Sequence, residues 1–152
     1  MTIDSEGGGS SPLRLLGLDV GDRRIGVAVS DPTGSLATPI EVYRRRDPGL
    51  DVQHMLDLVQ EYEAEGVVVG LPKNMNGTEG PQAEKTREFA DYLTAKGVSV
   101  SLWDERLSTV EATRRMEEQR HKRRGIRERI DSEAAALILQ TYLDHMRWRK
   151  ER

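Results

Sequence analysis

Asp19 is a carboxylate at a position where a folded chain seldom tolerates charge. It interrupts an apolar run, Leu15–Val20, that is typical of a strand packed on both faces. Burying a carboxylate is costly unless it is hydrogen-bonded, paired or bound to a cation. Two interpretations follow: a polar strand end bonded to the turn amides of residues 21–24, or a metal ligand on a rigid strand.

Two further acids lie at the ends of predicted elements. Glu105 follows a strand predicted over residues 98–103, and Asp131 precedes the last predicted helix. Ligands of open α/β sheets bind outside the carboxyl ends of the strands, so side chains from these positions can converge there. Each acid could also have a purely local role, because Asp131 is a good helix N-cap and Glu105 can pair with Arg106.

A cluster of these acids needs a counter-ion. Neighbouring carboxylates repel by about 4 kcal/mol per pair at ~4 Å and an effective dielectric constant of ~20. A divalent cation relieves that repulsion, and hard oxygen ligands favour Mg²⁺ or Mn²⁺ over zinc. The chain has no cysteine, which excludes disulfides and a thiolate zinc site.

The elements that must position the acids follow one order along the chain. Strands at 15–20 and 25–30 form a hairpin, and a third strand follows at 38–43. The pattern then changes to helix, strand, helix and strand, as expected for parallel strands joined by crossover helices. The further elements are a helix over 52–62, a strand over 67–71, a helix from Pro81 to Gly97, the strand over 98–103, a helix over 109–118 and the helix after Asp131. This order predicts an α/β fold with a mixed five-stranded sheet and helices on both faces.

Composition predicts one domain of ordinary size. The chain has 152 residues, of which 36% are hydrophobic and 32% charged. Residues 1–12 are polar and Gly-rich and predict a flexible tail, followed by a single domain over 13–150. No apolar stretch is long enough to span a bilayer and no export segment is visible, so we expect a cytoplasmic protein without membrane contact.

Charge is unevenly distributed. The formal net charge is −3, yet residues 114–129 carry eight basic and three acidic side chains. Such a segment is either an arm that binds a polyanion or a solvated run of charge, and composition alone does not decide between them.

Four ordered motifs resemble the YqgF/RuvX family of RNase H-like proteins. They read LGLDVGDRRIGVAVSD at 16–31, GLPKNMNGTEGP at 70–81, DERLST at 104–109 and IDSEAAALILQTYL at 130–143. The resemblance covers about residues 13–146, nearly the whole chain. One departure is Asn76, which stands where many members carry Asp.

The resemblance implies an RNase H-like fold and a nuclease. The family's acidic triad corresponds to Asp19, Glu105 and Asp131, which would hold Mg²⁺ or Mn²⁺, as two ions, for phosphodiester hydrolysis. Members are regarded as nucleases in maturation of the 16S rRNA precursor or as Holliday junction resolvases. No histidine is needed as a base, and we interpret the three histidines as surface residues. They are His54, His121 and His145.

Nucleic acid is then the expected partner, RNA or DNA, and the chain is expected to be a monomer or a weak homodimer. Positive or amide side chains near the motifs are candidates for holding the phosphate backbone. They are Arg23, Arg24, Lys73, Asn74, Arg106, Lys122, Arg123, Arg124 and Arg127. Trp103 is expected to pack in the core rather than to stack on bases.

Two other functions remain open. A non-catalytic RNA-binding or ribosome-assembly module would use the basic segment and keep the acids for structure alone. An actin-like ATP-binding protein shares the Asp19-Val20-Gly21 pattern, but such proteins need two domains of this kind and the chain is too short.

Overall fold

The computed structural model describes residues 14–107 and 126–151, apart from the side chains at 126–131, 148, 150 and 151. Its strands are β1 (Leu15–Val20), β2 (Arg24–Ser30), β3 (Ala37–Arg44), β4 (Gly66–Leu71) and β5 (Val100–Asp104). Its helices are α2 (Pro48–Glu61), α3 (Pro81–Ala95), the 3₁₀ turn η2 (Glu105–Leu107) and α5 (Ile126–Glu151). Within the described residues, no helix is long and apolar enough to cross a membrane.

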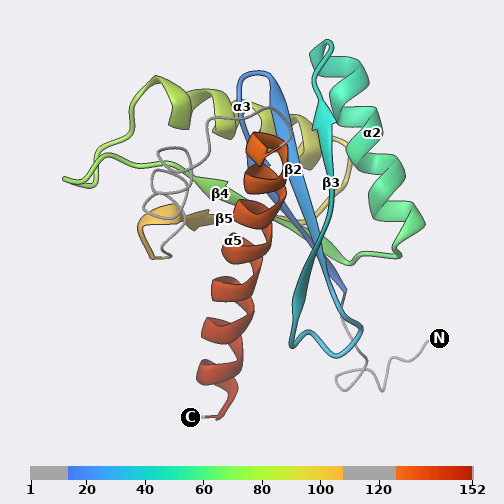
Figure 1. Cartoon of the computed structure of the whole chain (residues 1–152), viewed down its shortest axis with the longest axis vertical. Coiled ribbons are helices and arrows are strands. Elements are labelled where there is room, and N and C mark those ends of the chain that lie inside the picture. The colour runs from blue at the N-terminus through green and yellow to red at the C-terminus, as the bar shows by residue number, and fades with distance from the viewer. Residues whose placement is uncertain (1–13, 108–125, 152) are drawn as a thin grey trace.

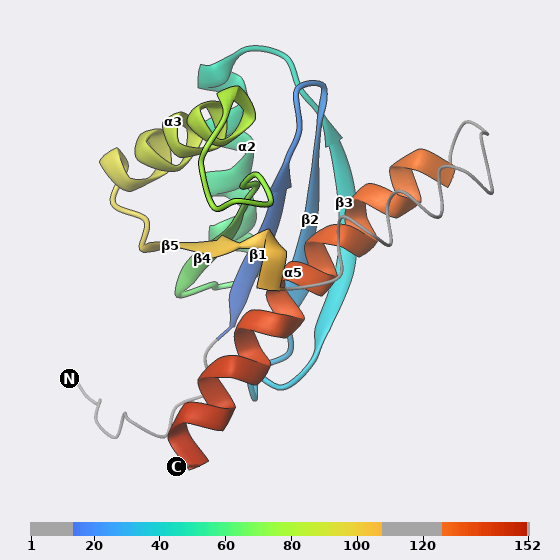
Figure 2. The same cartoon turned by 90° about the vertical axis from the view of Figure 1, so that its left-hand side faces the viewer.

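The five strands form one sheet in the order β3-β2-β1-β4-β5. β1 pairs antiparallel with β2, and β2 with β3, whereas β4 lies parallel to both β1 and β5. Helices α2 and α3 cover one face of the sheet and α5 crosses the other (Figures 1 and 2). The predicted mixed sheet with helices on both faces is confirmed.

Alternation along β1 accounts for how one strand serves both a core and a polar site. Leu16, Leu18 and Val20 belong to the apolar core beneath α2 and α3. Successive side chains of a strand point to opposite faces, so Gly17 and Asp19 belong to the face that α5 covers. The apolar run is therefore two-sided, as predicted, and Asp19 occupies the α5 face at the carboxyl end of the strand.

Helix α5 runs antiparallel to β1, with its first turns near the carboxyl end of that strand (Figures 1 and 2). The prediction that Asp131 precedes this helix is wrong, because α5 begins at Ile126. Arg127, Glu128 and Arg129 are good helix formers and extend the helix toward Gly125. Asp131 therefore lies inside a helix and is not its N-cap. The helix predicted over 109–118 and the tail over 1–12 lie outside the described residues.

A buried carboxylate joins the end of β3 to the start of α2. Asp51, 1% exposed, accepts hydrogen bonds from Tyr43 Oη at 2.9 Å, Arg45 Nε at 3.0 Å and Arg46 N at 2.8 Å. Burial alone would raise the pKa of Asp51, but these three donors outweigh it and hold the pKa below its usual value. This carboxylate is fully used in the fold.

Replacing Asp51 with Asn should lower the free energy of unfolding by about 2 kcal/mol at pH 7, because the amide cannot serve all three donors and Arg45 loses its counter-charge. The native pKa lies below the ordinary 3.8, so the stabilisation is complete above that value and disappears as pH falls through the native pKa. The difference in free energy of unfolding between the wild type and Asp51→Asn, measured with urea, should therefore be smaller at pH 3 than at pH 7. A difference that does not change with pH would contradict this account, and Asp57→Asn on the exposed side of α2 is the control.

Candidate acidic site at the carboxyl end of the sheet

Asp19 and Glu105 meet in one cavity of about 300 Å³ at the carboxyl ends of β1 and β5. Both side chains are buried, at 9% and 7% exposure. The other lining residues are Val20, Gly21, Asp22, Arg23, Arg24, Pro72 and Gln82. Two of the three predicted acids, which are 86 positions apart in the sequence, are thus brought together by the fold.

A glycine makes that meeting sterically possible. β4 lies between β1 and β5, and Gly70 stands near its carboxyl end. A Cβ atom at Gly70 would lie 3.2 Å from Glu105 Cγ and 2.5 Å from Ile138 Cδ1. The missing side chain leaves room for Glu105 and for α5 above β4. Sequence reasoning did not single out Gly70, although a glycine inside a buried strand often marks such a close approach.

The third predicted acid, Asp131, lies in the first part of α5, and its side chain is outside the described part of the chain. Among the residues that are described, no three acids or histidines gather as a metal-binding group. The acidic side chains described in the cavity lining are Asp19, Asp22 and Glu105, of which only Asp19 and Glu105 are buried. Buried carboxylate oxygens suit a hard divalent cation, with further ligands from water, substrate or another acid.

The β1–β2 turn carries two of the predicted substrate ligands into the cavity wall. Gly21 N donates to Arg24 O at 2.9 Å, which closes the turn. Arg23 and Arg24 both line the cavity beside Asp19. Gln82 donates from Nε2 to Val20 O at 3.2 Å and so ties the start of α3 to the same strand end. The cavity thus combines two buried acids with two cations on a short, closed turn.

Lys73 and Asn74 lie in the loop after β4, which is held by its own hydrogen bonds. Asn74 N donates to Thr78 O at 2.8 Å, and Asn74 Nδ2 donates to Thr78 Oγ1 at 2.9 Å. Asn76 Oδ1 accepts from Thr78 N at 3.0 Å and from Thr78 Oγ1 at 2.6 Å. An amide oxygen at position 76 therefore orders the loop as a carboxylate oxygen would. Contact of Lys73 and Asn74 with substrate stays a prediction.

Arg106 braces this loop against β5. Its Nη2 donates to Asp104 Oδ2 at 2.7 Å, its Nε donates to Asp104 Oδ1 at 3.1 Å, and its Nη1 donates to Met75 O at 3.3 Å. The hydrogen bond from the Arg106 side chain lowers the pKa of Asp104 and raises the pKa of Arg106. The described partner of Arg106 is thus Asp104 rather than Glu105. Its predicted contact with substrate would have to share the guanidinium with this pair.

Several other predicted residues are placed away from the cavity or outside the description. Trp103 is partly buried, packs against the core under α5 and donates from Nε1 to Thr141 Oγ1 at 3.0 Å. His54 is half-buried, 2.6 Å from Glu41 and stacked on Tyr43. His145 is exposed, and neither described histidine lines the cavity. Residues outside the description are His121, Lys122, Arg123, Arg124 and the side chain of Arg127.

Residues 13–145 match the RuvX family, which is described as Holliday junction resolvase. The chain belongs to this family. A relative from Halothermothrix orenii is 50% identical over 137 residues, which are 88% of this chain and 96% of the relative. One from Ruegeria pomeroyi is 48% identical over 134 residues, 88% of this chain and 87% of the relative. Both carry the name "Putative pre-16S rRNA nuclease".

Solved structures support the fold expected of the RuvX family. Thermus thermophilus RuvC matches with a TM-score of 0.58 at 15% identity, over 90% of this chain and 97% of RuvC. The same protein in complex with a Holliday junction substrate matches with a TM-score of 0.56, over 89% and 96% of the two chains. The predicted RNase H-like fold is confirmed by this likeness, which at such low identity concerns the fold alone.

Proposed function

We propose that this chain is a metal-dependent endonuclease that cuts phosphodiester bonds in structured nucleic acid, with the 16S rRNA precursor as its substrate. The observation that carries the proposal is the pair of buried carboxylates, Asp19 and Glu105, in one cavity beside Arg23 and Arg24. The names of the relatives support an rRNA substrate, and the family description makes a four-way DNA junction the second substrate to test.

The backbone of α5 supports Asp131 as the third acid. A Cβ atom at Gly17 would lie 3.0 Å from Ala135 O, so these two residues mark where β1 and α5 touch. Two residues further along β1, about 6.6 Å, is Asp19. Four residues back along the antiparallel helix, about 6 Å, is Asp131. Both residues thus stand at about the same level along the sheet.

In this proposal Asp19, Glu105 and Asp131 would hold the ions, and Asp19 would serve both ions because it lies on β1 near the centre of the sheet. A bound pair of Mg²⁺ or Mn²⁺ ions supplies an activated water and stabilisation of the leaving oxygen. Arg23 and Arg24 then hold the adjacent phosphates on the closed β1–β2 turn. Such contacts position a strand without reading its sequence.

The test is a cleavage panel with three substrates: a 5′-extended 16S rRNA precursor, a four-way DNA junction and single-stranded DNA. We expect site-specific cleavage of the precursor with Mg²⁺ or Mn²⁺ and none in EDTA. Cleavage that persists in EDTA would contradict the metal dependence. Binding of the precursor without cleavage in either metal would identify a non-catalytic RNA-binding module instead. A mass measurement in solution belongs beside the panel, because two paired cuts in a junction require a dimer.

Gly70→Ala tests the position of Glu105. The new methyl group would press on Ile138 Cδ1, a side-chain end that can turn away, and on Glu105 Cγ. Moving a catalytic group by about 1 Å can cost about a hundredfold in rate, whereas overpacking by one methyl should cost only about 1–2 kcal/mol of stability. We expect cleavage to fall far more than the melting temperature. Full cleavage by the variant would show that Glu105 is not part of the site. Gly49→Ala on α2 is the control.

A further inference from the structure

A second cavity, of about 640 Å³, adjoins the acidic one and shares Asp22 and Arg23 with it. Its walls are the β1–β2 turn, the chain from the end of β3 to the start of α2, and α3. We call it the arginine cleft and define it by Arg23, Arg44, Arg45, Arg46, Lys85 and Tyr92. It lies beside the acidic site, on the side of the sheet that α2 and α3 cover.

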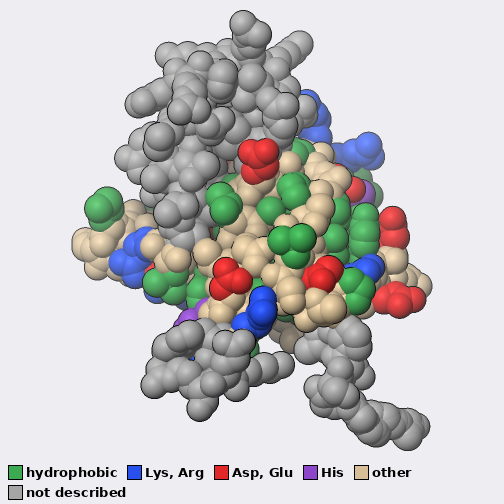
Figure 3. Space-filling model, turned by 60° about the horizontal axis from the view of Figure 1, so that its bottom comes forward, with side chains coloured by type: hydrophobic (Ala, Val, Ile, Leu, Met, Phe, Trp, Pro, Cys, Tyr) green, Lys and Arg blue, Asp and Glu red, His purple; other side chains and the backbone are tan. Residues whose placement is uncertain are grey.

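The arginine cleft is positive in a chain whose net charge is negative. Its lining holds five cationic side chains and three acids, Asp22, Asp51 and Glu88. Asp51 is bound by Arg45, and Asp22 lies 3.4 Å from Lys85. By contrast, the lower end of the molecule shows apolar and acidic side chains among the coloured residues, with basic ones mainly at its margins (Figure 3).

One of these arginines is held in place by the fold. Arg45 donates from Nε to Asp51 and from Nη1 to Gly21 O at 2.8 Å, and its guanidinium lies 5.3 Å from the centre of the Phe89 ring. It lines the cleft as a largely buried side chain. Arg23 and Arg46 are exposed around it, so their charge faces solvent at the mouth of the cleft. A polyanion that enters the cleft would meet both.

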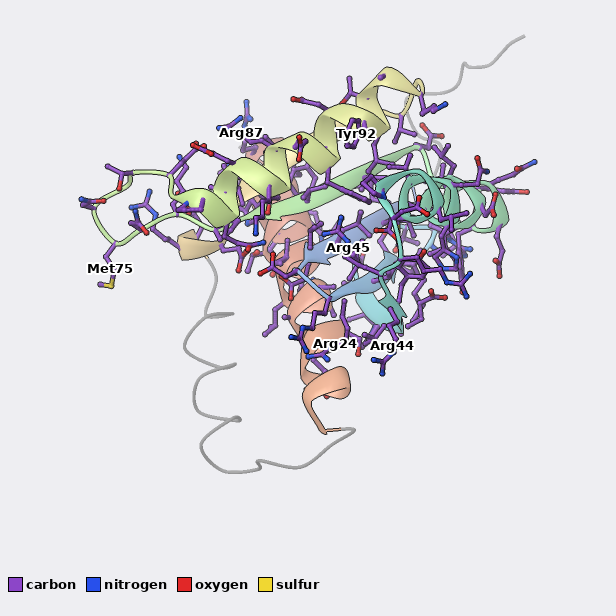
Figure 4. The ribbon with its side chains drawn as sticks, turned by 90° about the horizontal axis from the view of Figure 1, so that it is seen from above. Arg24, Arg44, Arg45, Met75, Arg87 and Tyr92 are labelled. Atoms are coloured by element: carbon purple, nitrogen blue, oxygen red, sulfur yellow. The ribbon has the colours of Figure 1, made fainter. Side chains whose placement is uncertain are left out.

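A cross-strand pair of arginines lies beside the cleft. Arg24 and Arg44 are direct partners on antiparallel β2 and β3, so their side chains share one face of the sheet. Arg24 lines the acidic cavity, and Figure 4 shows both arginines on the side of the strands that faces α5, away from Tyr92. The positive charge that faces α3 in the cleft therefore comes from Arg23, Arg45 and Arg46.

An exposed aromatic ring completes the cleft. Tyr92 on α3 is 44% exposed and lines the cavity that contains the arginines (Figure 4). Grooves that bind single strands combine cations along the phosphate backbone with aromatic rings on which bases stack. A base inside a duplex does not offer its face to such a ring, so this composition favours an unpaired strand.

We infer that the arginine cleft binds a single-stranded flank of the substrate as it leaves the acidic site, with phosphates on Arg23 and Arg46 and a base on Tyr92. The inference rests on the proposed nuclease function and extends it. It assigns to the α2–α3 side of the molecule a contact surface made of other residues than the basic segment at 114–129.

The experiment measures binding in EDTA, so that no strand is cut, with fluorescent RNA strands that end at the cleavage site or extend past it by increasing lengths. The test variant is Arg46→Ala. The matched control, Arg149→Ala, removes the same charge from an exposed position in the last turns of α5. We expect the test variant to lose about fivefold in affinity for extended strands, with a salt slope lower by about 0.7, since that is what one lost phosphate contact removes. Strands that end at the cleavage site should bind as they do to the wild type.

Tyr92 gives a second, independent readout. Tyr92→Ala should weaken the binding of extended single strands by about tenfold, whereas Tyr92→Phe keeps the ring and should bind normally. Wild-type affinity of the arginine variant for extended strands, or an equal loss in the α5 control, would overturn the inference. Cleavage by the wild type is scored separately. If no substrate is cut but the binding of extended strands still depends on Arg46 and Tyr92, the nuclease proposal fails and the cleft remains a nucleic-acid contact.

Discussion

Asp19→Asn should abolish cleavage while the protein still folds and binds nucleic acid. The substitution replaces an anionic oxygen with an amide nitrogen, which cannot ligate a hard cation. We expect a loss of about 10³-fold or more in the single-turnover rate, which corresponds to about 4 kcal/mol of transition-state stabilisation. The effect should be large because Asp19 is buried and lies on a rigid strand.

Three measurements separate this result from misfolding. Cleavage is followed under single-turnover conditions, strand binding is measured in EDTA, and Mn²⁺ binding is measured by calorimetry without substrate. The variant should bind the strand as the wild type does and bind Mn²⁺ more weakly. Asp144→Asn, an exposed carboxylate on α5, is the control and should behave as the wild type in all three. Undiminished cleavage by Asp19→Asn would show that the acidic triad is wrongly assigned.

Gly17→Ala should have the largest effect on stability. A Cβ atom at this position would lie 2.7 Å from Leu139 Cβ and 3.0 Å from Ala135 O. Neither atom is the end of a flexible side chain, so α5 itself must move away from β1. We expect a cost of about 3 kcal/mol, at the upper end of what overpacking usually costs. The melting temperature should fall by about 6–12 °C in a chain of this size.

The matched control is Gly49→Ala. A Cβ atom there would come no closer than 3.4 Å to Asp47 Oδ1, an ordinary contact, and alanine is the better helix former on α2. The melting temperatures of the two variants should therefore differ by the full decrease expected for Gly17→Ala. Equal melting temperatures would mean that α5 packs less closely on β1 than the structure shows. Cleavage should also fall in Gly17→Ala, because α5 carries Asp131.

Much of the fold could be predicted because its signals are local. The two-sided apolar run around Asp19, the short run after Gly66, and Pro81 at the start of α3 each have one common structural meaning. The start of α5 could not be predicted from Asp131, because a good N-cap residue is also tolerated inside a helix when tertiary packing favours it. Element boundaries depend on such competition, so the helix begins earlier than expected.

The candidate site was predictable only in part. Asp19 and Glu105 could be named because an acid at the end of an apolar strand is costly to bury without a partner or a cation, and the motifs at 16–31 and 104–109 agree with that role. The role of Gly70 depends on which strand separates β1 from β5, which no local pattern reveals. The arginine cleft was missed for the same reason. Arg44, Arg45 and Arg46 resemble an ordinary charged turn until β2, β3 and α3 are brought together.

The insertion of β4 between β1 and β5 has a consequence for biosynthesis. Asp19 emerges early in translation, but its partner Glu105 can reach it only after β4 has paired with both β1 and β5. A contact between residues so distant in sequence forms late, because the closure of the long intervening loop must be compensated by pairing already made. In the proposed enzyme, a nascent chain emerging from a ribosome would therefore be chemically inert toward the RNA around it until nearly all of its domain had been synthesised.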